Sequence, residues 1–266
     1  MQYITDVIAA ISEVSPIEKP LFHFFHQSVF DGVSGYVDGG NACIIQTPWY
    51  SVQIIRGACC VLQGARLSSF TRWEFFIVAK RGENGCTITT FGAPAFFQCP
   101  SALNHSCADA GNQVRECFEQ AIVTWAGKLP LSFLVKDGLL NKLVSQIPLL
   151  GLAKTTEQAD VCLAQQPGMW WTEHHGNFCR LHSNGYTIFR YEGDTALLPK
   201  LAFTARDLVF PGYPYGLMLV DKFARVSHDE VDYLSSLFEC LAGKSWSYIV
   251  AGMRLLNAHS VLDSVK

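Results

Sequence analysis

One short apolar segment constrains the fold more than any other part of the chain. Residues 131–138, Leu-Ser-Phe-Leu-Val-Lys-Asp-Gly, form a nearly continuous apolar run that ends in Asp-Gly. A run of this kind is typical of a central strand that is buried on both faces. Residues 149–153 predict another short strand, and 139–147 predicts a short helix that ends at Pro148. A helical crossover between buried strands favours a parallel pair, because the chain must return to the same edge of the sheet.

The rest of the chain predicts strands first and helices later. A short strand over 35–40 runs into a glycine turn, and the next residues predict a meander. The expected strands of the meander are 51–62, 73–79 and 86–91, and 168–192 is expected to add two more. Apolar residues at helical spacing predict helices over 2–13, 111–126, 215–225, 228–242 and 246–263. Together these elements predict an α/β fold in which helices flank a mixed sheet.

Composition limits the classes of function. Only 16% of the residues are charged and 49% are apolar, whereas an average globular protein has roughly 25% charged residues. A disordered chain is excluded, since disorder requires low hydrophobicity and high charge. The net charge of −3 gives no bulk attraction to nucleic acid or to an anionic membrane. A surface so poor in charge predicts an oligomer or partner interface.

The cysteines and the chain start indicate where the protein works. Ten cysteines occur without a Cys-x-x-Cys pair or a zinc-type Cys/His ladder. The first residues lack the basic region of a secretory signal, and no apolar run reaches the roughly 18 residues of a membrane span. We therefore expect a cytoplasmic protein with reduced thiols and no membrane partner. Rossmann, P-loop and nucleophile-elbow motifs are absent from the sequence.

Two aspartates are candidates for metal chemistry. Asp38 and Asp137 each end a predicted strand and each precede a glycine. If the strands are neighbours, both carboxylates project at the same edge of the sheet, where they can hold divalent metals about 4 Å apart for phosphodiester hydrolysis. Glu119, on the helix between them, is the candidate third ligand, and Glu116, one turn away, is its competitor. The alternative is that each Asp-Gly pair is an ordinary turn or helix cap.

Segments spread along most of the chain resemble elements of the NurA nuclease family. Val-Asp-Gly-Gly at 37–40 resembles the first Asp-Gly-Ser element of the family, and Leu-Val-Lys-Asp-Gly-Leu-Leu at 134–140 resembles its Leu-Asp-Gly-Ser-Leu element. Gly-Tyr-Pro-Tyr-Gly-Leu at 212–217 is similar to its Tyr-Pro-Tyr-Pro-Leu segment. Further segments that resemble family elements in the same order are 55–58, 119–121, 151–155, 189–192 and 258–263.

This resemblance implies an RNase H-like fold and a manganese-dependent DNA nuclease, with Mg²⁺ as the alternative metal. It implies a two-metal carboxylate mechanism and either 5′–3′ exonuclease or single-strand endonuclease activity. It also implies a homodimer that works with a hexameric HerA-type ATPase in DNA end resection and repair or in phage defence. We expect one domain over 1–266, with an RNase H-like core over about 33–160, an aromatic-rich insertion over about 165–195 and a helical part over about 210–266.

The resemblance also assigns roles to individual residues. It implies that Asp38, Glu119 and Asp137 bind metal and that Tyr213 lies beside them. Asp221 stands where the family has a histidine, about two helical turns after that tyrosine. An aspartate can bind a metal but cannot act as a neutral imidazole ligand. Two alternatives therefore stay open, which are a catalytically weakened subunit that serves as a structural partner of the ATPase, and an RNase H-like enzyme that acts on RNA.

Four cations are candidates for DNA contacts. Arg56 and Lys154 are expected near the carboxylates, where each could hold a phosphate or simply be a surface cation. Arg180 and Arg190 lie among the aromatic residues of 168–192. Interleaved aromatics and cations can stack on and guide single-stranded DNA, whereas the alternative is an ordinary aromatic core.

Overall fold

The computed structural model describes Ile4, 20–83, 85–104, 106–154, Leu163, 165–173 and 176–263, without the side chains of 256–263. Its strands are β1 (His23–Phe24), β2 (Val33–Gln46), β3 (Tyr50–Gln63), β4 (Arg66–Gly82), β5 (Gly85–Phe91), β6 (Ala102–Leu103), β7 (Phe133–Asp137), β8 (Leu149–Ala153), β9 (Trp170–Thr172), β10 (Phe178–Arg180) and β11 (Phe189–Gly193). Its helices are α2 (Ala110–Ala126), α4 (Leu198–Thr204), α5 (Tyr215–Ala224), α6 (His228–Ala242) and α7 (Trp246–Asp263), with 3₁₀ turns η1 (Thr195–Leu197) and η2 (Gly243–Ser245).

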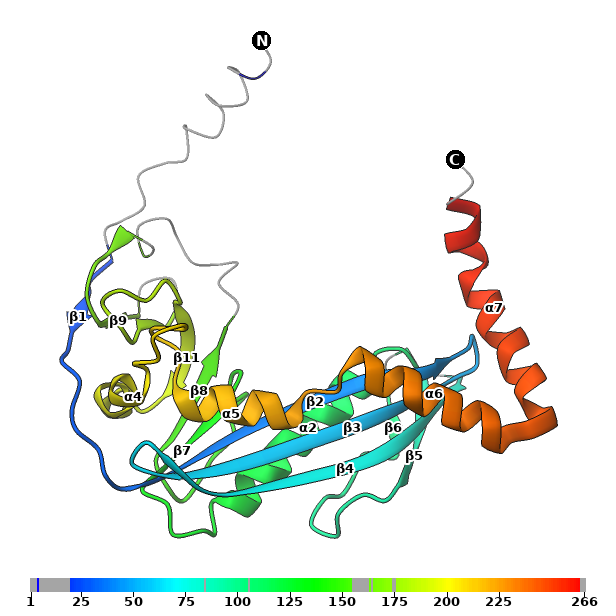
Figure 1. Ribbon diagram of the computed structural model, residues 1–266, viewed down its shortest axis with the longest axis horizontal. Helices are drawn as coiled ribbons and strands as arrows, with labels where there is room; N and C mark the ends of the chain where they lie inside the picture. The colour runs from blue at the N-terminus through cyan, green and yellow to red at the C-terminus, as the bar shows by residue number, and fades with distance from the viewer. Residues whose placement is uncertain are drawn as a thin grey trace.

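The described strands form one mixed sheet in the order β1-β9-β10-β11-β8-β7-β2-β3-β4-β5-β6. The long strands β2, β3 and β4 form an antiparallel meander, while β7 pairs in parallel with β2 and with β8. The parallel pairing was expected from the apolar runs in β7 and β8, which are buried on both faces. The sheet and its helices confirm the expected α/β fold, in which helices flank a mixed sheet (Figure 1).

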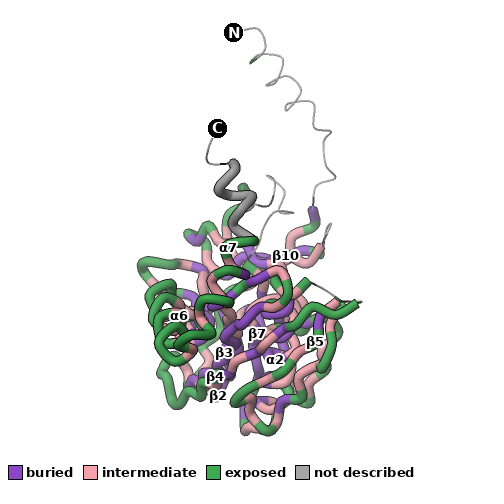
Figure 2. Tube along the Cα trace, turned by 90° about the vertical axis from the view of Figure 1, so that its right-hand side faces the viewer, coloured by how far each residue is buried: buried purple, intermediate pink, exposed green. Residues whose placement is uncertain are grey.

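Helices cover both faces of the central strands (Figure 1). Neighbouring residues of a strand point to opposite faces, and the core divides accordingly. Tyr36 belongs to the cluster that packs under α5, whereas Val37 belongs to the cluster that packs under α2. Figure 2 shows the resulting buried interior along β3 and β7, between more exposed outer elements such as α6.

The parallel ladder between β2 and β7 ends where the two aspartates begin. Its last paired residues are Val37 and Lys136, so Asp38 and Asp137 lie directly beyond it. The expectation that Asp38 ends a strand at a glycine turn is wrong, because β2 continues to Gln46 by pairing with β3. The pairing of β2 with β7 therefore stops just before Asp38, although β2 itself continues beyond it.

The helix expected over 139–147 is absent from the structure, which has turns and irregular backbone there. Asn141 and Lys142 have φ values of 51° and 66°, in the left-handed region that breaks a right-handed helix. The Glu192 carboxylate on β11 accepts hydrogen bonds from the amides of Leu140 and Asn141, at 2.7 and 3.2 Å. A partner distant in sequence therefore holds this segment out of a helix.

The remaining expectations about elements have mixed outcomes. The helices expected near 111–126, 215–225, 228–242 and 246–263 are confirmed. The stretch 168–192 contributes three strands rather than two, and these strands extend the central sheet. The helix expected over 2–13 lies outside the described residues except for Ile4. No helix within the described part of the chain is both long and apolar enough to cross a membrane.

Candidate metal centre

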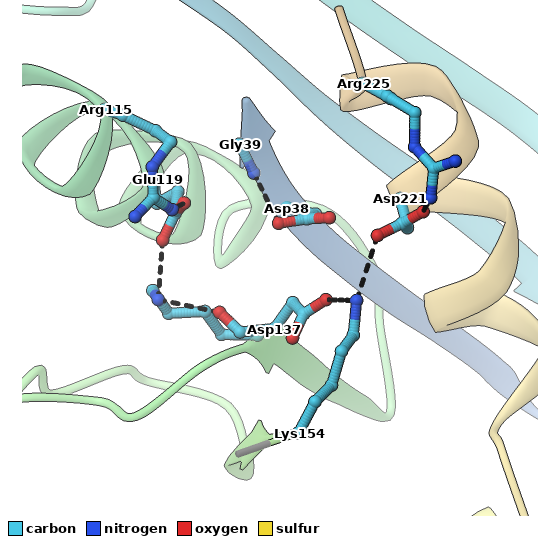
Figure 3. Close-up of polar contacts among 9 residues, drawn as sticks. Asp38, Gly39, Arg115, Glu119, Asp137, Lys154, Asp221 and Arg225 are labelled. Carbon is cyan, nitrogen blue, oxygen red and sulfur yellow. Dashed lines mark hydrogen bonds and ion pairs between the residues drawn. The ribbon is translucent and has the colours of Figure 1, made fainter. Parts of the chain in front are cut away.

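Three aspartates from distant parts of the chain meet beside the end of β7. Asp38 comes from β2, Asp137 from β7 and Asp221 from α5 (Figure 3). One carboxylate oxygen of each lies within 4.8 Å of the others. Carboxylate oxygens are the ligands that hard divalent cations such as Mg²⁺ and Mn²⁺ prefer. The donor set therefore fits a divalent metal ion of this class.

The alternation of the strands explains why these side chains meet. Asp38 is two residues after Tyr36 and Asp137 is two residues after Val135, and both earlier residues pack in the cluster under α5. The two aspartates therefore face α5. On that helix, Val220 is fully buried in the same cluster and brings the next residue, Asp221, close to the sheet.

Two glycines let α5 approach the sheet closely. A Cβ atom on Gly216 would lie 2.2 Å from the ring of Tyr36, and one on Gly40 would lie 2.2 Å from the carbonyl oxygen of Ala224. Both distances are far below van der Waals contact, so a side chain at either position would push the helix away. Gly40 was expected to form a turn, but its role in the structure is this close approach within a strand.

The electrostatics of the three aspartates differ. Burial and the neighbouring charges of Asp137 and Glu119 hold the pKa of Asp38 well above its ordinary value. Burial also raises the pKa of Asp137, although Lys154 opposes this shift. The pKa of Asp221 is lowered, because its contacts with Lys154 and Arg225 outweigh the effect of burial. Three carboxylates so close together, one of them buried, favour a cation.

Lys154 lies between two of the aspartates (Figure 3). Its Nζ is 2.6 Å from Asp137 Oδ2 and 2.9 Å from Asp221 Oδ1. It also lies 5.4 Å from the centre of the Tyr213 ring. Burial and the charge of Asp137 raise the pKa of Tyr213 to about 12, so its phenol keeps its proton at neutral pH. The structure thus places Lys154 and Tyr213 beside the aspartates, while their roles in binding or catalysis stay predictions.

Two pockets flank Asp221. One has a volume of about 320 Å³ and is lined by Lys154, Phe210, Tyr213, Met218, Asp221 and Arg225. The other has a volume of about 220 Å³ and reaches Asp38 and Gly39. Both include Asp221 and Arg225. A ligand bound at the aspartates therefore has open space in two pockets that meet at Asp221 and Arg225.

Glu119 is buried on α2, on the other side of the sheet from α5. Its Oε2 is 2.6 Å from Nζ of Lys136, and its Oε1 pairs with Arg115. Burial raises the pKa of Glu119 in spite of these two cations. Its side chain passes over Gly39, where a Cβ would lie 2.8 Å from Glu119. Glu116, the expected competitor, is exposed on the same helix. A metal-binding role for Glu119 stays a prediction.

The other cations expected to touch DNA differ in their surroundings. Arg56 is buried, and its guanidinium binds the carboxylates of Glu74 and Glu230 and the carbonyl oxygen of Arg225. Arg180 is also buried and donates to three carbonyl oxygens, those of Gln166, Ser183 and Gly185. These two guanidinium groups are therefore engaged within the protein, which argues against a direct DNA contact by either.

Arg190 is half-buried on β11. The aromatic residues expected to stack on DNA beside it are mostly core, since Trp170, Phe178 and Phe189 are all buried. The alternative of an ordinary aromatic core therefore describes these three residues. DNA contact by Arg190 itself stays a prediction.

Sequence reasoning missed several charged residues around the site. Lys136 and Arg115 hold Glu119, and Arg225 pairs with Asp221 at 2.7 Å. One signal was available in the sequence, because a lysine within an apolar central strand must have an anionic partner when buried. The i, i+4 spacings of Arg115 with Glu119 and of Asp221 with Arg225 were also readable on the two helices.

Comparison with known proteins shows which fold the chain shares with a solved structure. No family model matches the chain, and no curated protein matches its sequence. The crystal structure of the NurA nuclease from Sulfolobus solfataricus is similar to the chain, with a TM-score of 0.55 and 10% sequence identity over 92% of this chain and 95% of the nuclease. Human ENDOV has a TM-score of 0.43 at 12% identity, covering 77% and 86% of the two chains.

The endonuclease V from Bacillus subtilis has a TM-score of 0.39 at 12% identity, covering 90% and 93%. At these low identities a structural likeness shows the fold alone, and the two endonuclease V structures are too distant to support any inference about function. The likeness to the NurA nuclease confirms, at the level of the fold, the resemblance found in the sequence.

Proposed function

We propose that the protein is a metal-dependent nuclease that hydrolyses phosphodiester bonds in DNA. The observation that carries this proposal is the convergence of Asp38, Asp137 and Asp221 to within 4.8 Å. They converge on a fold shared with the NurA nuclease, and a cluster of carboxylates of this kind suits two-metal phosphodiester hydrolysis.

The chemistry is set by the groups at the site. Divalent metal held by Asp38, Asp137 and Asp221, with Glu119 as a further ligand, would supply charge to activate water and to stabilise the leaving oxygen. The water oxygen bonds to phosphorus, the ester bond to the leaving oxygen breaks, and one proton passes to that oxygen. We propose that Lys154 and Arg225, which line the pocket beside Asp221, bind the non-bridging phosphate oxygens. The protonated phenol of Tyr213 can donate a hydrogen bond to the phosphate or to water.

The finer parts of the proposal come from the sequence resemblance. We propose Mn²⁺, with Mg²⁺ as the alternative, and 5′–3′ exonuclease or single-strand endonuclease activity. We also propose a homodimer that acts with a hexameric HerA-type ATPase in DNA repair or phage defence, in the cytoplasm. The low charge content supports such assembly, since a translocating ring would supply much of the grip on DNA.

The test is a cleavage assay on single-stranded DNA, double-stranded DNA and RNA, with Mn²⁺, Mg²⁺ or EDTA. We expect DNA cleavage that requires the metal and falls by at least about 100-fold in Asp38→Asn and Asp137→Asn, since each removes a charged ligand. Asp232→Asn is the matched control, because Asp232 is exposed on α6. Full activity in both site variants would contradict the proposal. Cleavage of RNA without cleavage of DNA would identify RNA as the substrate.

A weakened subunit is a second candidate, and one observation favours it. Lys154 already neutralises part of the charge of Asp137 and Asp221 by direct contact. A site balanced in this way would bind metal weakly and serve as part of an assembly with the ATPase. Thermal unfolding at increasing Mn²⁺ separates the two candidates, because a ligand that binds the folded state raises the melting temperature. A rise that Asp38→Asn abolishes favours the nuclease, and no response favours the weakened subunit.

A further inference from the structure

The loop between α4 and α5 is held in one shape beside the metal centre. The amide of Gly212 donates to the carbonyl oxygen of Ala205 at 2.9 Å and closes the loop. Asp207 Oδ1 accepts hydrogen bonds from the amides of Val209 and Phe210, at 2.8 and 2.9 Å. Such side-chain bonds to the backbone fix a turn. These hydrogen bonds therefore fix the conformation of the loop tip.

This tip presents three consecutive apolar side chains to solvent. Leu208 is 98% exposed, Val209 is 75% exposed and Phe210 is 58% exposed. Exposed apolar residues that occur singly are ordinary, but a contiguous group on a fixed loop indicates a contact surface. Phe210 differs from the other two, because it also lines the pocket of about 320 Å³ beside Asp221.

The walls of this pocket differ in chemistry. Phe210, Met218 and Tyr213 are its apolar and aromatic residues, while Lys154, Asp221 and Arg225 are its charged residues. Asp221 is shared with the aspartate cluster, so the pocket is continuous with the place where the phosphate would bind. A nucleotide has the same division, with a flat aromatic base next to an anionic phosphate.

We infer that this pocket binds the base of an unpaired nucleotide next to the cleaved phosphodiester, with the base stacked on Phe210. The inference rests on the proposed function and adds a base-binding subsite to it. A base within a duplex has both faces covered by its neighbours, so only an unpaired or extruded base can offer a face to Phe210. The site therefore selects single-stranded segments, and it does so without reading the base sequence, because every base has a stacking face.

The experiment compares Phe210→Ala with Leu208→Ala as the matched control. Leu208 lies on the same loop and is more exposed, but it is not part of the pocket lining. Cleavage is mapped on single-stranded oligonucleotides that carry one abasic position. We expect KM to rise on the order of 10-fold in Phe210→Ala, with a smaller change in kcat, because base–aromatic stacking is an interaction of this size. For wild type, KM should rise by a similar factor at bonds next to the abasic position.

The effects of Phe210→Ala and of the abasic position should not add, since each removes one partner of the same stacked pair. Phe210→Ala should therefore cleave abasic and intact oligonucleotides equally, and Leu208→Ala should behave like wild type. Equal cleavage of the two oligonucleotides by wild type would overturn the inference while leaving the nuclease proposal in place. Equal defects in the two loop variants, with a change in native mass, would overturn it as well and would identify the loop as an interface between copies of the chain.

A binding measurement keeps the inference separate from activity. Oligonucleotides with 2-aminopurine are titrated into Asp137→Asn protein, and stacking on Phe210 is expected to quench the fluorescence. The quench should disappear when Phe210→Ala is added to this variant and persist with Leu208→Ala. If wild type cleaves no DNA, the nuclease proposal fails, and this quench then decides the subsite by itself. Absence of a quench with Phe210 present would overturn the subsite.

Discussion

Asp38 and Asp221 face each other across the candidate metal centre, yet their surroundings shift their pKa values in opposite directions. Burial and like charges raise the pKa of Asp38, whereas Lys154 and Arg225 lower that of Asp221 in spite of burial. The same Asp-to-Asn change should therefore have opposite effects on stability at the two positions. Asn keeps the shape of the side chain, including an oxygen for the 2.7 Å bond from the Gly39 amide to Asp38.

We predict that Asp38→Asn stabilises the metal-free protein at neutral pH and that Asp221→Asn destabilises it. The first change removes a charge that the folded state disfavours, and the second leaves Lys154 with one anionic partner fewer. Each kcal/mol gained or lost would shift the melting temperature by roughly 2–4 °C in a domain of this size. Thermal unfolding in EDTA, followed by circular dichroism, measures both shifts.

The pH dependence gives this prediction its control. A raised folded-state pKa means that the penalty from Asp38 is absent below its ordinary pKa of 3.8 and grows as the pH rises toward the folded-state value. The gain in Asp38→Asn should therefore shrink as the pH falls from neutral toward 3.8. Asp221 has a lowered pKa, so its contribution persists over this range and is lost only at lower pH. Parallel pH trends in the two variants would contradict the assignment.

At the residue scale, the sequence predicted candidate ligands better than their surroundings. Asp38 and Asp137 were found because a carboxylate before glycine at a strand edge is a local pattern. Asp221 was found only through the family resemblance, since nothing around it on an amphipathic helix distinguishes it. The ion pair of Arg56 with Glu230 could not be predicted from the sequence, because Glu230 lies on a helix near the other end of the chain.

At the scale of elements, Arg56 joins the sheet to the end of α5. From β3 it binds Glu74 on β4 and Glu230 on α6, and its Nη1 donates to the carbonyl oxygen of Arg225 at 2.6 Å. That carbonyl directly follows α5, the helix that carries Asp221. The buried guanidinium therefore fixes the position of α5 relative to the carboxylates on the sheet.

We predict that Arg56→Met lowers the free energy of unfolding by about 2–3 kcal/mol. Breaking a fully buried ion pair costs about 3–5 kcal/mol, and the effect here is smaller because Glu74 and Glu230 are partly exposed. Weaker Mn²⁺ binding should accompany the loss, since Asp221 is less well positioned. Denaturant unfolding and Mn²⁺ titration measure the two effects. Arg66→Met, at an exposed position on β4, should change neither, and an equal loss there would show that the ion-pair network is not the cause.

The elements themselves were predictable where local and tertiary preferences agree. The apolar face of α2 and the continuous apolar run of β7 each match the surface on which they pack, so periodicity was sufficient. Residues 139–147 have local helical spacing, but Glu192 binds their amides from β11. Gly39 and Gly40 resembled a turn, while in the structure they make room for Glu119 and for the end of α5. Contacts between distant segments decided these cases.

At the scale of the whole molecule, the low charge content has a visible counterpart on the surface. Large apolar side chains are exposed on the two C-terminal helices, at Tyr233, Leu237, Leu241, Tyr248 and Leu255. Trp246 and Ile249 pack one side of α7 against the end of the meander, while the rest of the helix extends away from the sheet (Figure 1). Exposed apolar side chains on two neighbouring helices favour association.

We predict that the protein is a homodimer in solution and that α6 and α7 form part of the contact. Leu241→Glu and Tyr248→Glu should each shift the mass measured by sedimentation toward that of the monomer, because each places a charge in an apolar interface. Val144→Glu is the control, since Val144 is equally exposed but lies in the loop before β8. The monomer should keep its folded circular dichroism spectrum, as these side chains contribute little to the core. A wild-type protein that sediments as a monomer at all concentrations would contradict the dimer, and dissociation by Val144→Glu alone would move the contact to the other end of the sheet.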